Sequence, residues 1–224
     1  LDLSAHFDYY NYHNMLVAGD AFGRDVILHD DHYVSYHANL HYDSENMGVF
    51  PTRGAKFNAE YAYFTDNFTQ YDNHLGFSEL SAMWRISFAL NSRFTLQPMA
   101  YGRLLFGRDI PYIRQNVIGG QWFGHYFEQQ MPFVGVGNVE LTDPHFIAMQ
   151  LKAQQRLGTN NYILVHVAAA QHADKLRNIL DKGPMLGYQL GYYYKTIFGP
   201  LGANLEYSNK TNSLHFYINL GFEF

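Results

Sequence analysis

The chain has 224 residues, of which 47% are hydrophobic, 17% aromatic and only 16% charged, and its formal net charge is −5. This composition excludes a disordered chain, and 15 Lys plus Arg are too few for a phosphate-binding surface, so we expect no nucleic-acid partner. The sequence contains no cysteine, which excludes disulfides and thiolate metal sites, and no apolar run long enough for a transmembrane helix.

Apolar and polar residues alternate with a period of two along most of the chain, which predicts strands because successive strand side chains face opposite sides. We expect two strands within 1–30, with a boundary near Asn14, and about ten to twelve strands in all. The further strands are predicted, in chain order, at 33–43, 55–66, 79–90, 93–106, 145–157, 161–171, 185–197, 199–208 and 214–224.

Alternation on this scale fits either a soluble sandwich or a transmembrane barrel with an apolar outer face and a polar lumen. Length favours the barrel: sandwich strands average about five or six residues, whereas a tilted membrane strand needs about 9–11. Tyrosine and phenylalanine crowd the strand ends, as in interfacial aromatic girdles. A dry core would not tolerate the charged residues that fall in mid-strand on the polar face, namely Glu60, Arg85, Arg103, Lys152 and Glu206. These charges either line a selective pore or pair with each other and with a loop that plugs it.

Loop lengths predict the orientation, because bacterial barrels have short periplasmic turns and long external loops. With a periplasmic C-terminus, the external links are 66–75, 107–144, 172–184 and 209–213. The periplasmic links are then 44–53, which is oversized, 91–92, 158–161 and a tight turn at Gly199-Pro200. We expect loop 107–144 to fold into the lumen and 174–180 to form one or two helical turns.

Three motifs resemble those of the bacterial surface-antigen barrel superfamily, which includes barrel-assembly insertases and two-partner secretion transporters. One is Phe50-Pro51-Thr52-Arg53-Gly54, at a strand start after a periplasmic link. Another is Gly199-Pro200-Leu201, at the start of the penultimate strand. The last is the C-terminal strand, which resembles the signal read by the outer-membrane assembly machinery through Ile218, Leu220, Phe222 and Phe224.

A closer resemblance is to the barrel region of patatin-like phospholipases from Bacteroidetes-type bacteria, and it covers most of residues 32–224. It runs through Tyr63–Asn67, Tyr101–Arg103, Asn116–Gly120, Gln129–Phe133 and Glu206–Asn209. The superfamily barrel usually has about sixteen strands. The resemblance therefore implies one barrel domain, 1–224, that is either the C-terminal part of a longer protein with further strands or a smaller variant.

In that superfamily the long loop enters the lumen and carries an arginine in a V-R-G-F/Y-like motif. The corresponding stretch runs from Gln121 to Tyr126 and lacks this arginine, because Phe123 and His125 flank Gly124. Glycine and proline suit the sharp bends that such a loop needs. The lumen-loop motif expected here comprises Gly119, Gly120, Gly124, His125, Tyr126 and Pro132.

We expect no catalytic site in this chain. Patatin-like enzymes use a serine in G-x-S-x-G together with an aspartate, and the nearest match, Gly76–Leu80, lacks the second glycine. A barrel can also be an esterase through Ser and His on its lipid-facing wall, but the sequence places no such pair there. His29-Asp30-Asp31-His32 is the densest metal-ligand cluster, yet these residues suit an ordinary polar turn, so no metal or other cofactor is expected.

The sequence thus predicts an all-β, antiparallel outer-membrane barrel of a Gram-negative bacterium. The resemblance implies that its role is to anchor, and help to translocate, a patatin-like lipid acyl hydrolase. Expected partners are outer-membrane lipid and lipopolysaccharide and the barrel-assembly machinery, and a homodimer stays open. Two alternatives stay open as well: an insertase or secretion transporter of the same superfamily, and a small stand-alone barrel that acts as a lipid-hydrolysing enzyme or pore.

Overall fold

A computed structural model describes residues 1–10, 31–46, 50–65, 68, 70–71, 74–108, 110–122, 128–137 and 141–221. These residues form a ten-stranded main sheet and two small sheets. The helical segments among them are two short 3₁₀ turns, Tyr112–Arg114 and Leu176–Asn178. Within the same ranges there is no helix long and apolar enough to cross a membrane.

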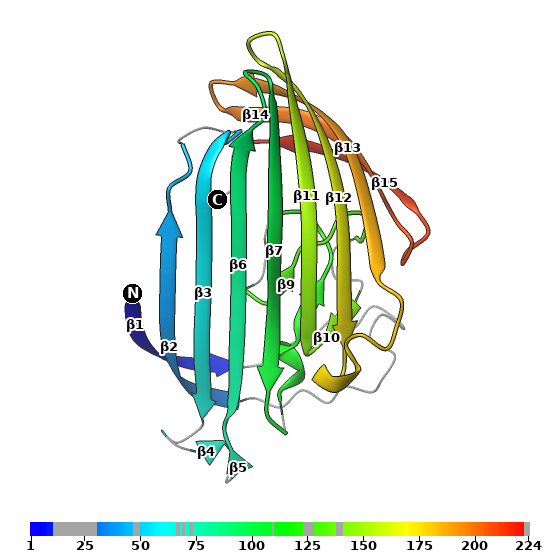
Figure 1. The fold of residues 1–224 in the computed structure, drawn as a ribbon. Helices are drawn as coiled ribbons and strands as arrows, with labels where there is room; N and C mark the ends of the chain where they lie inside the picture. The colour runs from blue at the N-terminus through cyan, green and yellow to red at the C-terminus, as the bar shows by residue number, and fades with distance from the viewer. Residues whose placement is uncertain are drawn as a thin grey trace.

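The strands of the main sheet follow one another without a crossover, and each neighbouring pair is antiparallel. In order they are β1 (Asp2–Tyr10), β2 (Asp31–Asp43), β3 (Arg53–Thr65), β6 (Phe77–Ala89), β7 (Phe94–Phe106), β11 (His145–Leu157), β12 (Asn161–Ala173), β13 (Met185–Thr196), β14 (Gly199–Ser208) and β15 (Leu214–Leu220). The sheet curves strongly, with the short strands β9 and β10 on its concave side (Figure 1).

The structure confirms the predicted strand pattern. The bounds of β11 and β14 equal the predicted ranges, and β2, β3, β6, β7, β12 and β13 lie within two residues of theirs. The turn predicted at Gly199-Pro200 is wrong, because these residues already pair with Thr196 and Lys195 and the chain turns at 197–198. Proline is compatible with the first residues of a strand, where it need not donate to the ladder. The second strand expected within 1–30 and the end of the C-terminal strand lie outside the described residues.

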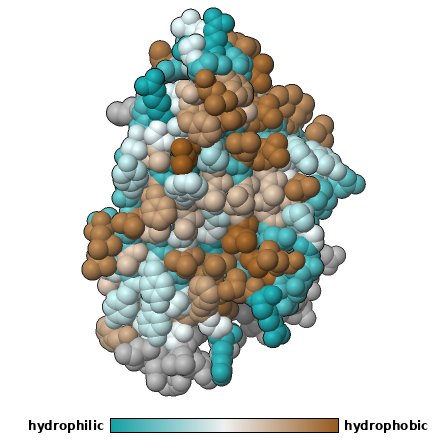
Figure 2. Space-filling view, in the orientation of Figure 1, coloured by the Kyte–Doolittle hydropathy of each residue, from teal (hydrophilic) through white to brown (hydrophobic). Residues whose placement is uncertain are grey.

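The convex face of the sheet is apolar, as the alternation predicts. Met149 is 70% exposed and Ile218 71% exposed, and both point away from the concave side with the other apolar residues of their strands. Apolar residues spread over much of this face (Figure 2). Among the described residues no second sheet covers it, so the sandwich alternative is not realised, and the face suits a hydrocarbon environment.

The sheet is curved but not closed. β1 pairs with β2 and β15 pairs with β14, and these two outer strands are not paired with each other in the described structure. The described strands therefore form an open arc with an apolar outside and a polar inside.

Residues 107–144 are here called the inner loop, and those of them that the structure describes lie against the concave face. They carry the small sheet of β8 (Asn116–Ile118), β9 (Gln130–Met131) and β10 (Leu141–Asp143). The largest core cluster joins Ile118, Phe133 and Val136 of this loop to inward residues of β7 and β11, including Tyr101 and Phe146. The expected inward fold of the loop is thus confirmed. The helical prediction for 174–180 is confirmed at its lower value, because this stretch contains a single 3₁₀ turn.

Candidate functional site: the concave face and the inner loop

One contact between the inner loop and the sheet is centred on Arg103 of β7. Its Nε and Nη2 donate to the two carboxylate oxygens of Glu79 on β6, each at 2.5 Å. Its Nη1 donates to the carbonyl of Arg114 and to Oδ1 of Asn116, both at 2.9 Å. Arg103 and Glu79 are buried, so this bidentate pair is desolvated and leaves little freedom to the loop segment bound to it.

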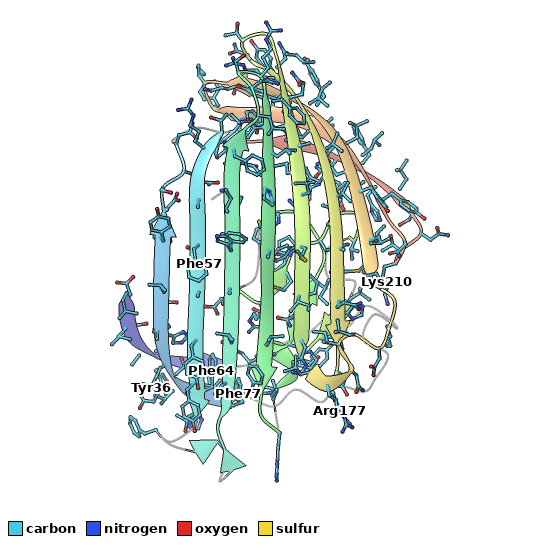
Figure 3. All side chains as sticks on the ribbon, in the orientation of Figure 1. Tyr36, Phe57, Phe64, Phe77, Arg177 and Lys210 are labelled. Atoms are coloured by element: carbon cyan, nitrogen blue, oxygen red, sulfur yellow. The ribbon has the colours of Figure 1, made fainter. Side chains whose placement is uncertain are left out.

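An aromatic cluster continues this contact. The guanidinium of Arg114 lies 4.2 Å from the centre of the Phe64 ring, and Phe64 stacks on Phe77 with ring centres 4.7 Å apart. Phe64 and Phe77 lie together where β3 and β6 lead to the short strands β4 (Gln70–Tyr71) and β5 (His74–Leu75) (Figure 3). The inner loop is therefore held by both charge and aromatic packing at this side of the sheet.

A second contact lies on the opposite wall, at Glu206 of β14. Its Oε1 accepts a hydrogen bond of 2.6 Å from Gln121, and its Oε2 accepts one of 2.9 Å from the backbone N–H of Gly135. Thr211 donates to the carbonyl of Gly135 at 2.9 Å. Gly135 has φ +77°, and a Cβ there would meet the Tyr207 backbone at 2.2 Å, so only glycine permits this approach.

The predicted lumen-loop motif falls between these two contacts. Gly119 and Gly120 both have positive φ, and a Cβ on Gly119 would lie 2.0 Å from the carbonyl oxygen of Gly137. The carbonyl of Pro132 accepts a 2.5 Å hydrogen bond from the hydroxyl of Tyr101. Gly124, His125 and Tyr126 lie outside the described residues. Gln121, two positions before the place where the resemblance puts an arginine, contacts the carboxylate of Glu206 instead.

The link 44–53, expected to be a plain periplasmic connection, reaches into the concave face. Glu45 accepts hydrogen bonds from Arg85 and Ser87 of β6. The Phe50 ring packs against Tyr162 of β12 in a tilted arrangement, with ring centres 4.1 Å apart. The carbonyl of Pro51 accepts a hydrogen bond from Gln97 of β7. The link therefore spans part of this end of the sheet, which explains its unusual length.

The rest of the predicted turn motif shapes this link. Oδ1 of Asn46 accepts hydrogen bonds of 2.9 Å from the backbone N–H groups of Thr52 and Arg53. Gly54 has φ +102°, and a Cβ there would lie 2.2 Å from the carbonyl oxygen of Ser44. The motif therefore allows the backbones at Gly54 and Ser44 to approach each other closely at the start of β3.

A cavity of about 840 Å³ remains between the link, the inner loop and the wall. Its charged lining includes Arg85, Lys152, Lys195 and Glu206. His166 also lines it, and both of its ring nitrogens are buried without a hydrogen-bond partner in the described part of the chain. A cavity of this volume admits a small polar molecule rather than a folded segment.

The other predicted lumen charge, Glu60, belongs to a serine–histidine–carboxylate relay. Nδ1 of His37 lies 2.5 Å from Oε1 of Glu60, and its Nε2 lies 2.8 Å from Oγ of Ser35. Such a relay activates a serine nucleophile when a substrate carbonyl can reach it. Ser35 is fully buried on the concave side, so a lipid ester cannot reach its Oγ atom in this conformation.

Of the cluster His29–His32, for which the sequence favours a polar turn over a metal site, the structure describes Asp31 and His32. Asp31 and His32 belong to β2, and the His32 ring lies 6.3 Å from the ring of Phe7 on β1. His29 and Asp30 lie outside the described residues. Within the described ranges no group of three or more His, Asp or Glu side chains could hold a metal ion.

The structure brings together residues that sequence analysis did not combine. Arg85 pairs with Glu45, and Arg103 pairs with Glu79. Of these two glutamates, only Glu79 could be assigned to the inner face from the sequence, because it falls on the polar side of an alternating strand. Nothing local marks Glu45, which lies in a link. Of the predicted assembly signal, Ile218 and Leu220 are exposed on the convex face, and Phe222 and Phe224 lie outside the described residues.

Comparison with known proteins gives one family. The family model of the OMP85 superfamily matches residues 2–224, nearly the whole chain. No curated protein matches the chain.

Proposed function

The chain belongs to the OMP85 superfamily and is an integral β-barrel protein of the outer membrane, and on this premise we propose that it anchors a patatin-like phospholipase in that membrane and helps to translocate it. The anchor itself carries out no catalysis. The observation that carries this proposal is the occupied concave face. The inner loop is bound to one wall through Arg103 and to the opposite wall through Glu206.

The bound inner loop favours an anchor over an open pore, because Arg103 and Glu206, two of the polar groups that would line a channel, are already paired with the loop. The buried position of Ser35 supports a chain without lipid-hydrolysing activity of its own. The link to patatin-like enzymes rests on the resemblance of segments such as Tyr101–Arg103 and Asn116–Gly120. Arg103 and Asn116, one from each of these segments, also contact each other in the fold.

The test is to isolate the polypeptide from native outer membranes and determine its intact mass and N-terminal sequence. A longer chain that carries G-x-S-x-G and D-G-G elements before these residues, and that releases fatty acid from phospholipid, is the expected result. A mature polypeptide that begins at Leu1 overturns the proposal. The Ser35→Ala variant is isolated in the same way and compared with the natural polypeptide. Its rate of fatty-acid release is expected to be unchanged, because an anchor does not contribute to the hydrolysis.

A second candidate function is that of an insertase or secretion transporter, and it is favoured by the outer edges of β1 and β15, which pair with no strand among the described residues. Exposed strand edges present backbone N–H and C=O groups to which another strand can add. A photo-crosslinking side chain in place of Leu3 on β1 tests it in living cells. Capture of unfolded outer-membrane proteins would favour the insertase, and capture of lipid alone would exclude it.

A further inference from the structure

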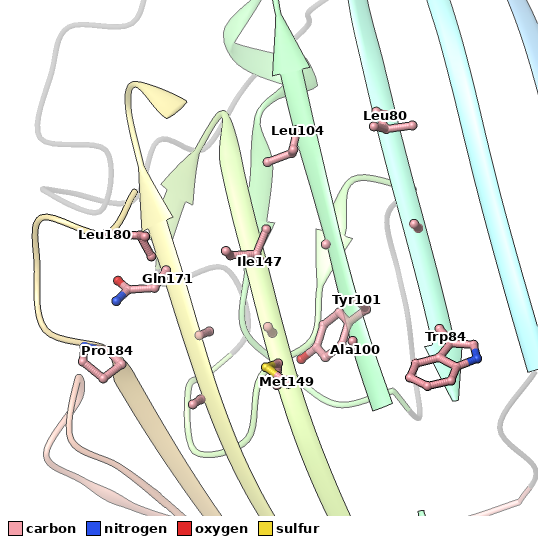
Figure 4. Close-up of a pocket in the computed structure, with 15 residues that line it drawn as sticks. Leu80, Trp84, Ala100, Tyr101, Leu104, Ile147, Met149, Gln171, Leu180 and Pro184 are labelled. Atoms are coloured by element: carbon pink, nitrogen blue, oxygen red, sulfur yellow. The ribbon is translucent and has the colours of Figure 1, made fainter. Parts of the chain in front are cut away.

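The convex face has a groove of about 560 Å³ on the side of the molecule that faces lipid. Small residues form its floor: Ala82 of β6 pairs with Gly102 of β7, and Ala100 lies two residues before Gly102 on the same face. Larger residues form its walls, with Trp84 on β6 and Ile147 and Met149 on β11. Figure 4 shows these side chains along the neighbouring strands.

The groove runs across the strands, because its lining passes from β6 and β7 over β11 to Ala169 and Gln171 of β12. Gly102 pairs with Ile147 and Ala100 pairs with Met149, so the larger side chains of β11 stand beside the small ones of β7. An apolar furrow that extends over four strands suits an extended hydrocarbon chain. Its volume lies within the range of ordinary small-ligand sites, about 300–1,000 Å³.

The loop 172–184 closes one end of the groove. Leu180 and Pro184 line the groove there, although Leu180 is 74% exposed to solvent in the isolated chain (Figure 4). The loop is held in place, because Nε2 of Gln171 donates to the carbonyl of Lys182 at 3.1 Å and Ile179 is buried. An exposed leucine in a loop of charged residues is explained if a hydrophobic ligand covers it.

The same loop supplies positive charge at the rim. Lys175, Arg177 and Lys182 are exposed, and the loop also contains the two acidic residues Asp174 and Asp181. Arg177 lies on the outside of the molecule, at the end of the strands that meets this loop (Figure 3). The site thus combines an apolar furrow across four strands with cationic side chains of the loop at which the furrow ends.

We propose that this groove binds one acyl chain of lipopolysaccharide and that Arg177 and Lys182 bind its phosphate groups. For one point, the external position of loop 172–184, the inference rests on the orientation that the loop lengths predict. Lipopolysaccharide in the outer leaflet carries several acyl chains and phosphate groups on one headgroup. Its acyl chains suit the apolar groove, and its phosphates suit the cationic side chains of loop 172–184. Cationic side chains at a membrane surface contribute about 1 kcal/mol each to such contacts, which corresponds to about fivefold in affinity.

The test measures the lipopolysaccharide and phospholipid that remain on the intact protein after purification from native outer membranes in mild detergent. Ala100→Phe fills the furrow, and the loss of contact with about two methylene groups reduces retained lipopolysaccharide about tenfold. The matched control, Ala203→Phe, places the same side chain on the outward side of β14 and retains the wild-type amount. Arg177→Gln with Lys182→Gln lowers retention about fivefold per cation, whereas Lys210→Gln in the external loop 209–213 does not.

Each variant is first checked for folding by its heat-modifiable migration in a gel. If Ala100→Phe does not fold, Leu180→Asp, in an exposed loop, provides the second test and also reduces retention. Equal retention by Ala100→Phe and Ala203→Phe overturns the proposal, as does retention of phospholipid in place of lipopolysaccharide. Cleavage of loop 172–184 by a protease on the periplasmic side also overturns the proposed lipopolysaccharide site. A polypeptide without a phospholipase domain, by contrast, overturns only the proposed function as an anchor.

Discussion

Nε2 of Gln121 donates a 2.6 Å hydrogen bond to Oε1 of Glu206, although 85 residues separate the two in the sequence. The other oxygen of the same carboxylate accepts from Gly135. One buried carboxylate on β14 therefore holds the inner loop at two points, and no local pattern connects these residues. Glu206 therefore determines the position of the inner loop next to β14.

Replacing Glu206 by Gln is expected to loosen the inner loop. The change removes a charged acceptor from two hydrogen bonds, each worth about 1.5–3 kcal/mol when one partner is ionised. Limited proteolysis of the inner loop in lipid should become about tenfold faster, because a loss of about 1.4 kcal/mol corresponds to that factor. Glu128→Gln, on the same loop but exposed, is the control and should leave the rate unchanged. Equal cleavage rates for the two variants would contradict this role of Glu206.

Replacing Arg103 by Met should destabilise the protein strongly. Glu79 would remain buried with only the longer contact of 3.4 Å to Arg114, and breaking a buried ion pair typically costs about 3–5 kcal/mol. Urea unfolding in detergent, followed by tryptophan fluorescence, measures the loss in the free energy of unfolding. The second substitution Glu79→Leu should recover part of it, because it removes the unpaired charge. A double variant as unstable as Arg103→Met would show that packing rather than charge causes the effect.

Alanine at Gly135 should cost much more stability than alanine at Gly158. Both glycines have positive φ, which costs a side chain about 1–2 kcal/mol. A Cβ at Gly158 has nothing within 4 Å, whereas one at Gly135 would lie 2.2 Å from the backbone of Tyr207. Unfolding free energies of the two variants in the same detergent give the comparison. Similar losses would mean that the inner loop shifts away from β14 without cost.

Arginine at Leu151 should destabilise the inserted protein by about 2–4 kcal/mol, because an outward charge in mid-strand meets the hydrocarbon centre of the bilayer. Arginine at Leu157, at the end of the same strand, should cost about 0–1 kcal/mol because it reaches the interface. Both positions are exposed on the convex face of β11. Equilibrium unfolding from lipid bilayers measures both values. Equal and small costs would show that this face does not contact lipid.

The sequence by itself determined the strands and their faces. The bounds of β11 and β14 were predicted to the residue, because a strand with lipid on one side and polar groups on the other must alternate at every position. The same alternation placed Glu60, Arg85, Arg103 and Lys152 on the inner face. Such a pattern is local, and so a single sequence is enough to find it.

Only the tertiary structure decided what those inner residues contact. Arg85 meets Glu45 from a link, Arg103 meets Asn116 from the inner loop, and Glu206 meets Gln121 and Gly135. The groove on the outside is equally non-local, since it needs Ala82, Ala100 and Gly102 side by side on two strands and Leu180 from a loop. Alternation specifies the side of the sheet on which a residue lies, but its partners depend on strand register and on how the long loops fold back, which period-two spacing does not encode.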